Sequence, residues 1–126
     1  MKDIEKIKIT TASTIGRALS VIDSGAVKIA LVVNDNNKLL GTLSDGDIRR
    51  GLLRKKTLDD TIEDVYFRRP ITANKRNSRE SLLSLCSKNK IGQIPIVDAD
   101  QKIVDLFISD DGHFRTLCGF FLDSGT

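Results

Sequence analysis

A glycine, a serine and an aspartate follow one another at three-residue intervals in the first half of the chain. Gly41, Ser44 and Asp47 form the pattern G-x-x-S-x-x-D within the stretch LLGTLSDGDIRRGLL, residues 39–53. A serine hydroxyl can donate to a phosphate oxygen, and an aspartate carboxylate can accept from both hydroxyls of a ribose. The backbone N–H groups of a helix that starts here attract anions. Together these features suit a nucleotide.

The elements that must position these residues are a strand and a helix. The apolar residues of 39–43 predict a short buried strand, and IRRGLL, residues 48–53, predicts a helix. Between them, Asp45-Gly46-Asp47 predicts a turn that carries an N-cap. Serine and aspartate at such a boundary are also common helix caps that bind nothing. The local pattern therefore leaves helix capping and ligand binding both open.

The preceding sequence predicts the rest of a small α/β unit. Residues 14–24 place apolar side chains at helical spacing and are followed by Gly25, which predicts a helix with one buried stripe. Residues 29–33 are apolar throughout and too few for a helix, so they predict a strand covered on both faces. The turn residues 34–37 then predict a hairpin into the strand at 39–43. A short edge strand is expected at residues 7–9.

A second copy of this arrangement follows the first. The sequence TLDD at residues 57–60 predicts a capping box ahead of a helix through Ile62 and Val65. A gapless shift of 64 residues then aligns the two halves, and it predicts a second helix at 78–87, a turn at 98–101 and strands at 94–97 and 102–107. Up to residue 111, the end of the second repeat, the identical pairs are Ile7 with Ile71, Leu19 with Leu83, Ser20 with Ser84, Val33 with Val97, Lys38 with Lys102 and Asp47 with Asp111.

This duplication predicts the domain boundaries. Residues 1–64 form the first repeat with its following linker helix, and residues 65–111 form the second repeat. Two such units can each cover the open face of the other's sheet. Residues 112–126 lie outside the repeat, and their apolar character predicts that they dock on the module or on a second copy.

Composition restricts the function classes. The 126 residues are 40% hydrophobic and 29% charged, with no signal-like or membrane-length apolar run, so a cytoplasmic location is expected. Cys86, Cys118 and His113 do not form a metal-ligand or catalytic pattern, which predicts no metal and no catalytic residue. The net charge is +3, and five basic residues lie within residues 49–56. This basic cluster is either a solvated helix face or a contact for phosphate or nucleic acid. No aromatic residues lie among these cations to stack bases.

The repeated unit resembles the cystathionine-β-synthase (CBS) domain, and the pair resembles a Bateman module. The resemblance rests on TIGRALSVIDSGAVKIALVVNDNNKLLGTLSDGDIRRGLL and SLLSLCSKNKIGQIPIVDADQKIVDLFISDD, which cover nearly all of residues 1–111. It implies an α/β (α+β) fold of two βαββα repeats, packed through small sheets with pseudo-two-fold symmetry. The stretch SDGDIRRGLL with the following LDDTIEDV is most similar to CBS pairs at the amino end of bacterial sugar-nucleotidyltransferase-like proteins.

The resemblance also implies roles for residues. Ser44 stands at the family's phosphate-contacting hydroxyl position, and Asp47 at its ribose-binding carboxylate position. Lys28 stands at a position that is often basic and meets phosphates, although a plain surface lysine is an equal alternative. The adenine slot is expected near the residues Ile9, Val27 and Ile29. The remaining residues of the expected ligand-binding set are Gly41, Asp45, Arg49 and Arg50, of which the arginines extend the phosphate field.

The second repeat departs from this pattern. Asp105 and Ile108 stand where the first repeat has Gly41 and Ser44, and only the aspartate, Asp111, is kept. An isoleucine cannot donate to a phosphate, and added carboxylates repel one. At most one good site per chain is therefore expected, and a helix cap is the favoured role of Asp111.

The predicted function is regulatory ligand binding without catalysis. The resemblance implies that AMP, ADP or ATP binds in the cleft between the repeats and controls an attached or partner enzyme, with a nucleotidyltransferase favoured. It also implies a homodimer formed through the CBS helices, and neither a resident cofactor nor a membrane partner is expected. Two alternatives remain open: a purely structural dimerisation module without a ligand, and a basic nucleic-acid-binding module.

Overall fold

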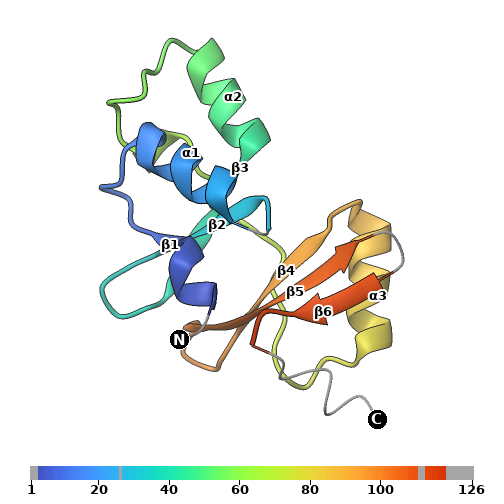
Figure 1. Cartoon of the computed structure of the whole chain (residues 1–126). Coiled ribbons are helices and arrows are strands. Elements are labelled where there is room, and N and C mark those ends of the chain that lie inside the picture. Colours follow the sequence, from blue (N-terminus) through green and yellow to red (C-terminus); the bar gives the residue numbers. More distant parts are fainter. Residues whose placement is uncertain (1–2, 26, 111–112, 119–126) are drawn as a thin grey trace. The chain divides into compact units, whose positions relative to one another are not determined.

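The computed structural model describes residues 3–25, 27–110 and 113–118 (Figure 1). The chain divides into two compact units, each with one three-stranded sheet. Residues 5–69 form the amino-terminal unit, and residues 70–126 with residues 1–4 form the carboxy-terminal unit. The division therefore falls between Arg69 and Pro70, five residues after the boundary expected from the sequence.

The amino-terminal unit is a small sheet covered by helices. Strand β2 runs parallel to β1 and antiparallel to β3, α1 packs on β2, and α2 packs on α1 and β3. All five residues of β2 are buried, as the continuous apolar run predicts. The elements of this unit are β1 (Lys8–Ile9), α1 (Ile15–Ser24), β2 (Ile29–Val33), β3 (Leu39–Ser44), α2 (Asp45–Leu53) and η2 (Ile62–Asp64). The division between the units falls within η1 (Asp3–Ile7), after residue 4.

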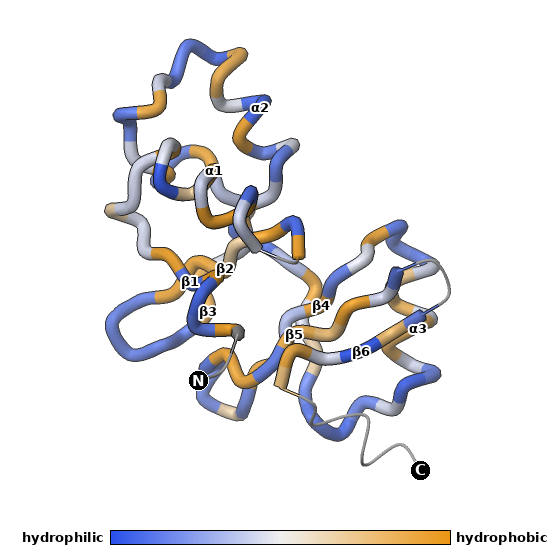
Figure 2. The backbone as a smooth tube through the Cα atoms, viewed as in Figure 1, coloured by the Kyte–Doolittle hydropathy of each residue, from blue (hydrophilic) through white to orange (hydrophobic). Residues whose placement is uncertain are grey.

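The carboxy-terminal unit repeats the helix and the hairpin. Helix α3 (Arg79–Asn89) packs on β4 (Gln93–Val97) and β5 (Ile103–Asp110), and β5 pairs with β6 (His113–Thr116). Figure 2 shows that β4 and β5 are largely hydrophobic and that the connections between strands are mostly hydrophilic. The buried core of this unit consists of Ala73, Leu82, Cys86, Ile94, Ile96 and Phe107.

Local details recur at the 64-residue shift, which confirms the predicted duplication. Thr14 caps α1 and Ser78 caps α3, and each side chain accepts from the backbone N–H three residues later. Asn37 and Gln101 both have a positive φ, 65° and 67°, at the last residue of the hairpin turn. The β-bulge before Val33 also recurs in the second hairpin. Matching turns and bulges give both hairpins the same register.

Three predicted features differ in the structure. Helix α2 begins at Asp45 and not after a turn at residues 45–47, because Ser44 is its N-cap. The residues 57–60 do not begin a helix: the Asp60 carboxylate accepts from the Thr57 N–H and hydroxyl, and only the short η2 follows. After β5, where the βαββα repeat implies a helix, residues 113–116 instead form β6 at the edge of the second sheet. Residues 119–126 of the segment expected to dock lie outside the described residues.

Candidate functional site

The junction of β3 and α2 brings Ser44 and Asp47 into direct contact. The Ser44 Oγ accepts from the Asp47 backbone N–H (3.2 Å), and Asp47 Oδ2 accepts from the Ser44 N–H and hydroxyl at 2.9 and 3.0 Å. This reciprocal arrangement is a capping box. The helix-capping interpretation is thus confirmed, and it places a hydroxyl, a carboxylate and a helix start side by side.

The second oxygen of this carboxylate is held by Arg50. Arg50 Nη2 donates to Asp47 Oδ1 at 2.7 Å, so the guanidinium turns back toward the start of α2. A Cβ placed on Gly46 would lie 3.4 Å from Arg50 Nη1, which locates the guanidinium over the first turn. The Asp47 side chain is only 14% exposed, whereas that of Arg50 is 65% exposed. The carboxylate is therefore fixed, and its arginine partner lies at the surface.

Arg49 and Asp45 pair with each other on the outer surface of the same helix. Arg49 Nη2 lies 3.5 Å from Asp45 Oδ2, and about two-thirds of each side chain is exposed. Exposed pairs of this kind contribute little to stability. Both carboxylates of the first turn, Asp45 and Asp47, lie where the helix dipole favours negative charge.

The start of β2 lies next to this junction, at the same end of the strands. Ile29 pairs directly with Ser44 in the antiparallel register, and the exposed Lys28 precedes it. Val27 and Ile29 are buried, with 4% and 8% of their surfaces exposed. Ile9 instead pairs with Val32, three residues farther along β2, roughly 10 Å from the edge that carries Ser44. The structure therefore brings Lys28 and Ile29 to the predicted site, but not Ile9.

Gly41 serves packing within the unit. A Cβ at this position would overlap the Phe67 carbonyl oxygen and lie 2.7 Å from Cδ2 of Tyr66. Phe67 pairs with the neighbouring strand residue Thr42 through two backbone hydrogen bonds, of 3.0 and 2.8 Å. Only glycine lets this segment approach β3 so closely. Sequence reasoning missed Tyr66 and Phe67, because their contact with β3 spans 25 residues of chain.

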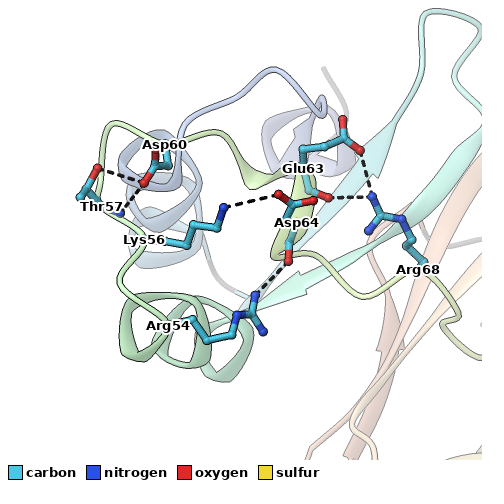
Figure 3. A network of polar contacts seen from close by, with 7 residues as sticks. All are labelled: Arg54, Lys56, Thr57, Asp60, Glu63, Asp64 and Arg68. Atoms are coloured by element: carbon cyan, nitrogen blue, oxygen red, sulfur yellow. Dashed lines mark hydrogen bonds and ion pairs between the residues drawn. The ribbon is translucent and has the colours of Figure 1, made fainter.

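Three basic residues after α2 contact oxygens of residues 63–64. Arg54 donates to the Asp64 backbone oxygen at 2.9 Å, and Lys56 lies 3.4 Å from the Asp64 carboxylate (Figure 3). Arg68 donates to both the backbone and the carboxylate of Glu63. Exposed ion pairs of this kind are weak, so the nucleic-acid interpretation of the basic cluster stays an alternative.

The carboxy-terminal unit does not rebuild this junction in its described residues. Asp105, the counterpart of Gly41, is fully buried, and its Oδ1 accepts from the N–H groups of Leu106 and Cys118 at 2.8 Å each. The counterpart of Ser44 is the buried Ile108, and β5 continues past it to Asp110 before β6 returns. Strand β6 thus follows β5 where α2 follows β3. Asp111 lies outside the described residues.

Within residues 3–25, 27–110 and 113–118, one other reactive group is buried. Cys86 lies in the core of the carboxy-terminal unit, where burial raises the pKa of its thiol. Among the described residues, no three His, Cys, Asp or Glu side chains are grouped to hold a metal ion. The described helices are too short or too polar to cross a membrane.

Residues 1–54 match the family model of the CBS domain. The chain also has the fold of CBS domain pairs. It is 27% identical to the CBS domain pair of protein MJ0100, solved with 5′-methylthioadenosine and S-adenosyl-L-methionine, with a TM-score of 0.68 over 82% of this chain and 86% of that one. A CBS domain protein of Pyrobaculum aerophilum complexed with AMP shares the fold, with a TM-score of 0.72, 15% identity and coverage of 86% and 87%.

Curated relatives are longer proteins. An L-aspartate semialdehyde sulfurtransferase of Methanocaldococcus jannaschii is 29% identical over 114 residues, which cover 88% of this chain and 22% of that protein. The chain spans less than a third of the length of each curated relative that it matches. These matches therefore concern one part of each relative.

Proposed function

We propose that this chain is a regulatory CBS module that binds an adenosine nucleotide at the β3–α2 junction of its amino-terminal unit and performs no catalysis. The observation that carries the proposal is the convergence of Ser44, Asp47, the start of α2 and the start of β2 on one edge of the sheet. The adenosine compounds bound by the MJ0100 domain pair support the choice of ligand class.

Each group at the junction has a role that fits its chemistry. The ribose hydroxyls donate to the Asp47 carboxylate, which accepts only. The phosphate meets the Ser44 hydroxyl, the N–H groups at the start of α2 and the ammonium of Lys28. The apolar side chain of Ile29, paired with Ser44, borders the base. Gly41 remains a packing residue, and Asp45 and Arg49 pair with each other outside the site.

Binding regulates an enzyme if the ligand prefers one of two conformations of the module. The longer relatives include an inosine-5′-monophosphate dehydrogenase and the sulfurtransferase, which supports an enzyme as the controlled partner. The resemblance of the SDGDIRRGLL and LDDTIEDV stretches to CBS pairs of sugar-nucleotidyltransferase-like proteins favours a nucleotidyltransferase as that partner. We further propose a homodimer, and sedimentation velocity across a concentration series tests it.

Thermal unfolding with and without ligand tests the binding proposal. A ligand present at about 100 times its dissociation constant adds about 2.7 kcal/mol to stability, which raises the Tm of a domain of this size by several degrees. We expect such a rise with AMP, ADP or ATP, and no rise with AMP in Asp47→Ala. Failure of every adenosine compound to raise the Tm of the nucleotide-free protein would contradict the proposal.

Asp47→Ala also removes a capping box, so a matched control is needed. The Asp60 carboxylate makes the same two hydrogen bonds, to the N–H and hydroxyl of Thr57, elsewhere in the amino-terminal unit. Asp60→Ala should lower the Tm of the free protein by a similar amount and keep the full rise with AMP. An equal loss of the rise in both variants would show that the effect of Asp47→Ala is one of stability alone.

A further inference from the structure

We infer that Arg50 sets the ligand selectivity of this site, because it must leave Asp47 before a ribose binds and can then pair with a phosphate. The inference rests on the proposed function and narrows its ligand to phosphorylated adenosine compounds. In this inference, Arg50 competes with the ribose for the Asp47 carboxylate and also attracts the phosphate.

The carboxylate of Asp47 has little capacity left for a ribose. A carboxylate offers about four lone-pair sites. Two hydrogen bonds from Ser44 occupy Oδ2, and the Arg50 guanidinium occupies one position on Oδ1 at 2.7 Å. A ribose diol needs two acceptor positions. Since the Ser44 bonds belong to the helix cap, the arginine is the partner that gives way.

Arg50 is free to give way and has a destination close by. Its side chain is 65% exposed, so its reorientation disturbs no packed core. The guanidinium lies over Gly46 in the first turn of α2, and an anion is favoured at a helix start. A phosphate bound there accepts from the same guanidinium, in the bidentate geometry that arginine and phosphate commonly adopt.

Phosphorylated and uncharged ligands therefore differ in the partner that Arg50 gains once its ion pair with Asp47 is broken. With AMP, the Arg50–Asp47 ion pair is replaced by an Arg50–phosphate pair. With adenosine or 5′-methylthioadenosine, the ion pair is lost and nothing replaces it. The loss of an exposed ion pair lowers affinity by about two- to fivefold, and a new charge-assisted bond raises it by about tenfold or more. Arg50 thus adds about tenfold to the selectivity for a phosphate, beyond the contacts with Ser44, Lys28 and the start of α2.

Calorimetric titration of AMP and of adenosine, at one low salt concentration, tests this inference in the wild type, Arg50→Gln and Arg17→Gln. Arg17 is an exposed residue in the first turn of α1, so its replacement removes the same charge from the same unit. We expect Arg50→Gln to weaken AMP about two- to fivefold and to strengthen adenosine binding by up to about fivefold, so that the AMP-to-adenosine affinity ratio falls about tenfold. Arg17→Gln should leave both affinities within twofold.

Each outcome has one meaning. If Arg50→Gln changes the two affinities by the same factor, or if Arg17→Gln lowers the AMP-to-adenosine ratio equally, the inference is wrong although the proposed function stands. The same holds if the wild type binds adenosine as tightly as AMP. If neither compound binds the wild type, the proposed function fails and the inference fails with it.

Discussion

Replacing Gly41 with alanine tests whether the close approach of residues 66–67 to β3 is a real requirement of the fold. A Cβ at this position would overlap the Phe67 carbonyl oxygen and lie within 2.8 Å of two ring carbons of Tyr66. The Phe67 oxygen cannot retreat freely, because it accepts from the Thr42 N–H while the Phe67 N–H donates to the Thr42 oxygen. The segment must therefore move away from the strand.

The expected cost follows from these contacts. Loss of the two backbone hydrogen bonds to Thr42 costs about 1–3 kcal/mol in total. Displacement of the Tyr66 ring adds about 1–3 kcal/mol of packing strain. Replacing a strand glycine with alanine also stabilises the folded protein by about 0.5–1 kcal/mol, which offsets part of this cost. We expect Gly41→Ala to lower the free energy of unfolding by about 2–4 kcal/mol and the Tm by about 10 °C.

Urea and thermal unfolding, followed by circular dichroism, measure this loss, and Gly46→Ala is the matched control. At Gly46, in the first turn of α2, the nearest atom to a new Cβ is the flexible Arg50 Nη1 at 3.4 Å. Alanine is the better helix former by up to about 1 kcal/mol, so this variant should be as stable as the wild type or more stable. A Gly41→Ala protein with the wild-type urea midpoint would refute the packing argument.

Three further effects are expected. Ser44→Ala removes the N-cap of α2 and should lower the free energy of unfolding by about 1 kcal/mol, measured by the urea midpoint. Asp105→Ala removes the acceptor of the buried Leu106 N–H and of the partly buried Cys118 N–H, so it should destabilise the protein by about 1–3 kcal/mol. It should also speed amide exchange at Cys118, and unchanged exchange would contradict this role. Burial raises the pKa of the Cys86 thiol above its ordinary 9.0, so iodoacetamide at pH 8 should modify Cys86 slowly until urea unfolds the chain. The free energy of unfolding should also fall as the pH rises through about 9, because only the unfolded thiol ionises there.

The strands and the duplication could be predicted because their signals are local or periodic. Residues 29–33 are apolar throughout and end at Asn34, whose Oδ1 accepts from two later N–H groups in the turn. The same turn chemistry at Asp98 fixed the register of the second hairpin. Short-range signals of this kind determine turn and strand together.

The prediction of a helix after residue 60 was wrong, and the contacts of this segment explain why. The Thr57–Asp60 hydrogen bonds that the pattern predicts are present, but they close a turn and do not start a helix. The chain beyond them is drawn into the core, where Ile62 is fully buried and Val65 packs against Gly51. Tertiary packing outweighed the local capping signal.

The candidate site was predictable only in part. The contact between Ser44 and Asp47 followed from their spacing, and the edge shared with Ile29 followed from the hairpin. The position of Arg50 depends on side-chain torsions that a sequence does not specify. The strand β6 could not be predicted, because its pairing with β5 replaces the helix that the repeat implied.

An NMR titration of the isotope-labelled protein with AMP tests the central claim most directly, because it reports the binding site residue by residue. We predict saturable amide shifts concentrated at Lys28, Ile29 and residues 44–50, with little change at residues 93–108 of the carboxy-terminal unit. Spectra that do not change at millimolar AMP, or shifts confined to the carboxy-terminal unit, would contradict the account.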